Sequence, residues 1–108
     1  MVRRSSPLHG TLDTLVLRVL AETPLHGYAV ARRLELGGLS VEEGSLYPAL
    51  YRLEKRGLLR SEWGTSELDR RAKFYHLTRK GRAALERDRA ELLRFAQSIK
   101  DILEPEAP

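Results

Sequence analysis

An apolar stripe near the C-terminus is the feature that most constrains the fold of this chain. Leu85, Leu92 and Ile99 recur every seven residues, which is the period of a helix that packs against another helix. Phe95, Ala96, Ile102 and Leu103 fill the adjacent positions. Such a helix, capped by Thr78, would span on the order of 40 Å, which is longer than the rest of a chain of 108 residues can cover.

The stripe therefore predicts a homodimer. A chain this short buries only roughly 60 to 65% of the surface that its unfolded form exposes, so a helix left over once the core is built needs a partner. We expect the second copy to contact Leu85, Leu92, Phe95, Ile99 and Ile102. The alternative is that this helix folds back onto its own domain.

Two shorter helices are predicted in the first third of the chain. Apolar residues recur at helical spacing over residues 11–20 and again over residues 28–36. Thr11 can cap the first helix, and Pro24 ends it. The second helix should end at the glycine pair that follows it, and we expect His26 to be a turn residue before it.

A third helix is predicted to end at Gly57, a natural helix terminator. Its apolar residues Leu46, Leu50 and Leu53 share one face. Ser40 and Glu43 have the spacing at which each side chain can satisfy an orphan backbone N–H of the other at a helix start. Pro48 complicates this start, because it lacks an N–H and would crowd the carbonyl four residues earlier. We therefore expect a distorted first turn or a later start capped by Ser45.

Two short strands are predicted after the third helix. Residues 58–63 and 72–77 are rich in apolar and aromatic side chains, and a polar loop that begins with Gly64 joins them. We expect a β-hairpin with a basic far end and with Trp63 packed at the end of its strand. Three short helices followed by a hairpin is the order of elements in a winged helix-turn-helix.

Cationic and hydroxyl side chains gather where a winged helix would meet DNA. The formal net charge of +4 favours a polyanionic partner, and the major groove of B-DNA admits one α-helix with an outward polar face. The candidate contacts on the third helix and in the hairpin are Ser45, Tyr47, Arg52, Lys55, Arg70, Arg71 and Lys73. The alternatives are an ordinary solvated face for the helix cations and packing of Tyr47 on the second helix.

The sequence thus predicts a mainly α fold of the α+β class, a winged helix-turn-helix with a two-stranded wing and a long C-terminal dimerisation helix. Residues 1–9 are expected to form an N-terminal arm. Residues 10–77 would form the DNA-binding domain, and residues 78–108 the dimerisation helix and tail.

Several other classes of protein are excluded. The absence of cysteine removes disulfides, thiolate metal sites and cysteine nucleophiles, and His9, His26 and His76 do not have metal-ligand spacing. No catalytic motif appears, so we predict no enzyme, cofactor or metal ion. No stretch approaches the ~18 apolar residues of a membrane span, and no signal peptide is evident, so a cytoplasmic protein without membrane contact is expected.

The chain resembles the PadR regulators in several motifs spaced as that family spaces them. They are His26–Tyr28, Gly44–Leu50, Leu53–Leu59, and Phe74–Thr78 followed by Gly81. The resemblance implies a homodimer of the branch with a single C-terminal helix, usually a repressor that binds operator DNA. It also implies that Tyr28, Ser45 and Tyr47 contact or position the DNA backbone. In some members a small molecule releases the DNA.

Two questions stay open at this point. A winged helix can also serve as a protein-interaction module without an operator, although the basic wing argues against that role. An effector pocket would lie at the dimer centre, between the first and last helices, but no convergent polar residues mark it. We therefore predict no effector-binding residue.

Overall fold

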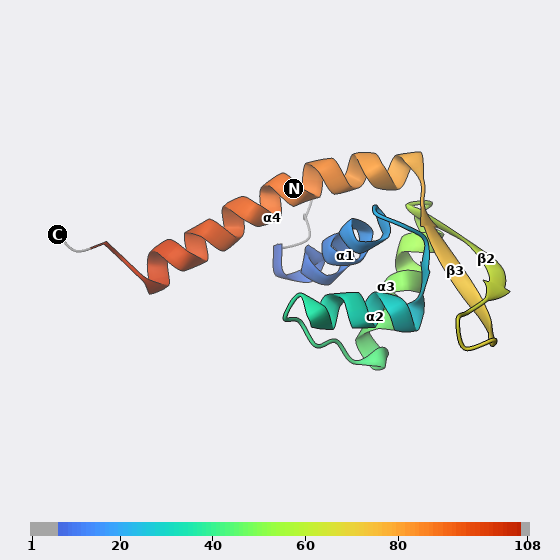
Figure 1. Cartoon of the computed structure of the whole chain (residues 1–108). Coiled ribbons are helices and arrows are strands. Elements are labelled where there is room, and N and C mark those ends of the chain that lie inside the picture. Colours follow the sequence, from blue (N-terminus) through green and yellow to red (C-terminus); the bar gives the residue numbers. More distant parts are fainter. Residues whose placement is uncertain (1–6, 107–108) are drawn as a thin grey trace.

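The computed structural model describes residues 7–106. They form four helices and a small three-stranded antiparallel sheet (Figure 1). The helices are α1 (Pro7–Leu20), α2 (Gly27–Leu36), α3 (Glu43–Lys55) and α4 (Arg79–Leu103), and the strands are β1 (Leu25–His26), β2 (Leu59–Thr65) and β3 (Arg71–Leu77). The predicted winged helix with a long last helix is confirmed.

The core lies where α1, α2 and α3 meet the sheet. Leu46, Leu50 and Leu53 of α3 are fully buried, as their spacing along one helix face predicts. They pack in one cluster with Val16 of α1 and Val30 of α2. This packing turns the opposite face of α3 toward solvent.

The end of α3 places the hairpin directly beside it. Gly57 has a φ of 80°, a left-handed conformation that glycine adopts at little cost. The N–H of Gly57 donates to the carbonyl of Glu54 at 2.9 Å, and the N–H of Leu58 donates to that of Leu53 at 2.9 Å. This is the Schellman pattern, and it confirms the predicted stop. The chain enters β2 at the next residue.

The start of α1 differs from the prediction. The helix begins at Pro7, where the fixed φ of proline suits a first helical residue. Thr11 therefore lies inside the helix and does not cap it. Residues 7–9 of the predicted arm are helical, and residues 1–6 lie outside the described residues.

The start of α3 also differs, because Ser40 and Glu43 do not form the predicted reciprocal cap. Glu42 is the N-cap residue and makes no side-chain capping bond; its carbonyl accepts from the N–H of Ser45 and Leu46 at 3.0 and 2.9 Å. Ser45 is thus part of the first turn. Pro48 lies further along and the helix runs through it, losing one backbone bond.

The sheet contains one strand that the sequence did not reveal. β2 and β3 form the predicted hairpin, with Leu59 opposite Leu77 and Thr65 opposite Arg71. We call this hairpin, residues 59–77, the wing. β1 pairs with the other edge of β3 through two residues only, too few to show any periodicity. It ties the segment before α2 to the wing.

The first part of α4 belongs to the core of the same chain. Thr78 caps the helix as predicted, because its hydroxyl accepts from the N–H of Gly81 at 2.9 Å. α4 then packs along α1, and Leu85 is 5% exposed within the core cluster. The prediction that Leu85 contacts a second copy is therefore wrong, since a heptad pattern cannot tell which turns face the chain's own domain.

The second part of α4 extends beyond the helical core (Figure 1). Leu92 and Phe95 are partly buried, whereas 39% of Ile99 and 77% of Ile102 is exposed. The molecule measures 58 Å along its longest axis. Contact of these four residues with a second copy remains a prediction. None of the described helices is apolar enough over a sufficient length to cross a membrane.

Candidate nucleic-acid interface

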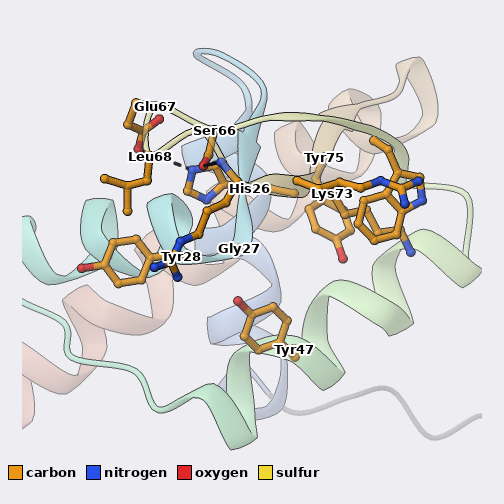
Figure 2. Close-up of a pocket in the computed structure, with 13 residues that line it drawn as sticks. His26, Gly27, Tyr28, Tyr47, Ser66, Glu67, Leu68, Lys73 and Tyr75 are labelled. Atoms are coloured by element: carbon orange, nitrogen blue, oxygen red, sulfur yellow. Dashed lines mark hydrogen bonds and ion pairs between the residues drawn. The ribbon is translucent and has the colours of Figure 1, made fainter.

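A cavity of about 480 Å³ lies between the wing, the start of α2 and the middle of α3. We call it the wing cavity. Figure 2 shows the wing turn on one side of it and Tyr47 on the other. Its lining combines aromatic rings, which come from α2, α3 and the wing, with cationic side chains, which come from the wing alone. The wing cavity is therefore where the candidate contacts from α2, α3 and the wing can be compared.

Tyr47 of α3 packs against the first residue of α2. A Cβ atom added to Gly27 would lie 2.6 Å from Cε1 of Tyr47, so only glycine leaves room for the ring at this distance. Tyr47 nevertheless remains 44% exposed and lines the wing cavity. The ring thus rests on α2, as one interpretation of the sequence held, and also faces the candidate interface.

Tyr28 follows Gly27 and lines the same cavity with 62% of its surface exposed. The helix that carries it is capped by His26, whose Nδ1 accepts from the N–H of Ala29 at 3.2 Å. His26 was expected as a turn residue, and the structure makes it both the N-cap of α2 and part of β1. These contacts fix Tyr28 in the first turn of α2.

His26 also connects α2 to the wing. Its ring packs edge-to-face on Phe74 of β3, with 5.3 Å between ring centroids. Because Nδ1 is an acceptor, the neutral ring carries its hydrogen on Nε2. Nε2 lies 3.5 Å from the Oε1 atom of Glu67 in the wing turn, too long for a hydrogen bond. The carboxylate of Glu67 is itself exposed and lies at the edge of the wing cavity.

The three predicted wing cations all line the cavity, but their surroundings differ. The guanidinium of Arg71 lies over the ring of Trp63, 4.5 Å from its centroid. Lys73 lies 3.5 Å from the carboxylate of Glu54 on α3. Arg70 is exposed and has no ion pair among residues 7–106. Arg70 and Arg71 are thus the cations most open to an anionic partner.

Trp63 is the functional candidate that the sequence analysis missed. It was expected to pack at the end of its strand, but 59% of it is exposed, and it lines the wing cavity. The cation–π contact with Arg71 holds its ring on the wing surface. The sequence did contain one indication that Trp63 is functional, because this residue lies in a hairpin that is rich in arginine.

The candidates of α3 other than Tyr47 lie away from the wing cavity. Arg52 pairs with Asp13 of α1, with 2.9 Å between Nη2 and Oδ1, so its guanidinium is directed toward α1. The Nζ atom of Lys55 lies 5.8 Å from the ring centroid of Tyr51. Ser45 is exposed in the first turn. Their DNA contacts remain predictions.

Tyr75 of β3 forms the buried part of the cavity wall. Burial raises the pKa of its phenol, the positive charge of Lys73 partly offsets that rise, and Glu54 and Tyr47 add to it. Tyr75 therefore stays neutral at physiological pH and adds no charge to the wall. The charge of the cavity comes from its rim.

Comparison with known proteins finds similarity to transcriptional regulators, both in a family profile and in a single relative. The sequence profile of the transcriptional regulator PadR-like family matches residues 16–87, which is more than half of the chain. The transcriptional regulator Rv3488 of Mycobacterium tuberculosis is 38% identical over 84 residues, with 78% of each chain covered.

Solved structures agree in fold over nearly the whole chain. A PadR family transcriptional regulator from Eggerthella lenta is 36% identical, with a TM-score of 0.74, and 91% of this chain and 86% of that one are covered. A PadR-like transcriptional regulator from Bacillus cereus is 29% identical, with a TM-score of 0.76, and 94% of this chain and 100% of that one are covered.

Proposed function

Because this chain belongs to the PadR-like family of transcriptional regulators, we propose that it is a repressor that binds an inverted-repeat operator as a homodimer. Members of this family are DNA-binding regulators and not enzymes. The repressor role, the dimer and the form of the operator are the steps that the proposal adds.

The observation that carries the proposal is the convergence of aromatic and cationic side chains on one cavity beside α3. Tyr28 and Tyr47 offer hydroxyl groups from the helices, and Arg70 and Arg71 offer guanidinium groups from the wing. Most protein–DNA hydrogen bonds go to phosphate and sugar, and side chains of these types make them. With α3 in the major groove, the wing cavity would take the adjacent DNA backbone.

The dimer supplies the second half of the operator contact. Leu92, Phe95, Ile99 and Ile102 of α4 would pack against the same residues of a second copy around a two-fold axis. Two α3 helices would then enter successive major grooves about one turn of DNA, ~34 Å, apart. The operator is accordingly expected to be an inverted repeat.

Repression would follow if the operator overlaps a promoter. An effector that releases the DNA would favour a dimer in which the two α3 helices are wrongly spaced, and it can shift the population only by its differential affinity for the two forms. Its expected place is the dimer centre, between α1 and α4.

The test is fluorescence anisotropy of the purified protein with tiled fragments of its own upstream region, at several salt concentrations, with random DNA as control. Affinity for one fragment should fall by about 0.9 log units per log unit of salt for each phosphate neutralised. Failure to bind any fragment at low salt would favour the alternative, a winged-helix protein-interaction module.

Gly27→Ala is expected to weaken operator binding about tenfold while the domain stays folded. The new Cβ would lie 2.6 Å from the ring of Tyr47, and a half-exposed ring can swing away at little cost to the core. Anisotropy titration measures the affinity, and circular dichroism checks the fold. Gly10→Ala is the matched control, because nothing lies within 4 Å of its added Cβ.

The double variant Gly27→Ala/Tyr47→Ala decides the mechanism. It should bind no more weakly than Tyr47→Ala alone, because both changes remove the same contact. Fully additive losses would show that Gly27 acts by another route.

A further inference from the structure

We propose that Glu54 is a positioning residue, which fixes the wing relative to α3 and so determines how well the protein distinguishes its operator from other DNA. The inference rests on the proposed DNA binding and adds a role to a residue that carries the wrong charge for contact with phosphate. Glu54 lies in the last turn of α3, where the helix passes the wing.

One carboxylate joins α3 to both strands of the wing. Its Oε2 atom accepts a hydrogen bond from the hydroxyl of Ser61 on β2 at 2.5 Å. Its Oε1 atom lies 3.5 Å from Nζ of Lys73 on β3. The side chain of Glu54 is 31% exposed. Because it is partly buried, water screens its two contacts only in part.

The register of the hairpin explains why one residue can reach both strands. Ser61 is opposite Tyr75, and Lys73 is opposite Trp63, so these four residues share one face of the wing. That face carries the wall of the wing cavity. A carboxylate held between Ser61 and Lys73 therefore fixes the surface that bears the exposed Trp63 with respect to α3.

The negative charge of Glu54 allows two effects of its removal to be distinguished, because they change the affinity for DNA in opposite directions. Neutralising a carboxylate near the DNA surface should, by electrostatics alone, strengthen binding to every DNA sequence. Loosening the wing should instead weaken binding to the operator, because the contacts of α3 and the wing must form together. It should leave random DNA, which needs no fixed register, little affected.

The experiment compares Glu54→Gln with Glu43→Gln in anisotropy titrations against the operator and random DNA. Glu43 is a matched control because it lies on the same helix, is exposed and has no ion pair within the described part of the chain. We expect Glu54→Gln to lower the ratio of operator to random affinity about tenfold. Glu43→Gln should leave that ratio unchanged.

A second measurement needs no DNA. Trp63 is the single tryptophan of the sequence and lies on the wing, so acrylamide quenching of its fluorescence reports how accessible its ring is, and a loosened wing should make the ring more accessible. Quenching should increase in Glu54→Gln and in Ser61→Ala, and it should stay at the wild-type level in Glu43→Gln. Ser61→Ala also keeps the test valid if Glu54→Gln fails to fold.

The outcomes separate this inference from the proposed function. The positioning role is wrong if wild-type protein prefers an operator but Glu54→Gln raises the affinity for operator and for random DNA by the same factor. If the wild-type protein binds no DNA, the proposed function fails, and quenching alone then decides whether Glu54 orders the wing. Equal quenching in all variants would overturn the inference in either case.

Discussion

Replacement of both Arg70 and Arg71 by alanine is expected to lower the affinity for any DNA by more than about 100-fold at moderate salt. Both side chains line the wing cavity, and neither has an ion pair among the described residues. A dimer would lose four cations, so the slope of log affinity against log salt should fall by about 3 to 4 units. Anisotropy titrations over a salt series measure both quantities.

The matched control is Arg87→Ala/Arg94→Ala, which removes the same charge from α4. These arginines are exposed on the face of the helix opposite Leu92 and Ile99, and Arg87 differs from the wing arginines in that it pairs with the neighbouring Asp88 at 3.1 Å. The control should keep nearly the wild-type salt slope. Equal losses in the two double variants would mean that net charge alone, and no particular surface, attracts the DNA.

Ile99→Glu is expected to separate the dimer into monomers. Ile99 is 39% exposed in one chain, so the change costs the isolated domain little. In a two-fold seam it would bury two unpaired carboxylates, and the dissociation constant of the dimer should rise by more than about 100-fold. Sedimentation velocity over a range of concentrations measures this constant, and operator affinity should fall with it.

Ala90→Glu is the control for this prediction, because Ala90 is exposed on the far side of the same helix. It should remain dimeric. If Ile99→Glu also sediments as a dimer, α4 is not the interface, and the exposed stripe must have another role.

Several features that depend on neighbours in the sequence were predicted well, although the expected caps at Thr11 and at Ser40 and Glu43 were wrong. Leu46, Leu50 and Leu53 were placed on one buried face because helical spacing alone determines which side chains point the same way. Thr78 and Gly57 were identified as boundaries because a side-chain cap and a left-handed residue act within a few residues of the helix end.

Features that depend on contacts between distant segments could not be predicted. The pairing of Arg52 with Asp13 joins residues of two helices, and no sequence spacing reveals it. β1 exists because β3 offers it a free edge. Leu85 was assigned to the dimer because the heptad continues unbroken from the core into the exposed part of α4.

The wing cavity illustrates the same limit. The sequence identified Tyr47, Arg70 and Arg71 singly, but only the folded chain brings them around one space with Trp63. Trp63 lies exposed on the wing with Arg71 stacked over its ring, a contact that a pattern of apolar residues does not indicate.

The continuity of α4 has a mechanical consequence. One unbroken helix of 25 residues begins at the base of the wing, passes through the core at Leu85 and ends in the exposed stripe. It can act as a lever arm of roughly 37 Å that is rigidly attached to the domain at one end. A turn of about 10° at the far end would displace the domain by roughly 6 Å over that length. The crossing angle of two such helices would therefore set the distance between the two α3 helices, and small repacking in the seam would be amplified at the DNA.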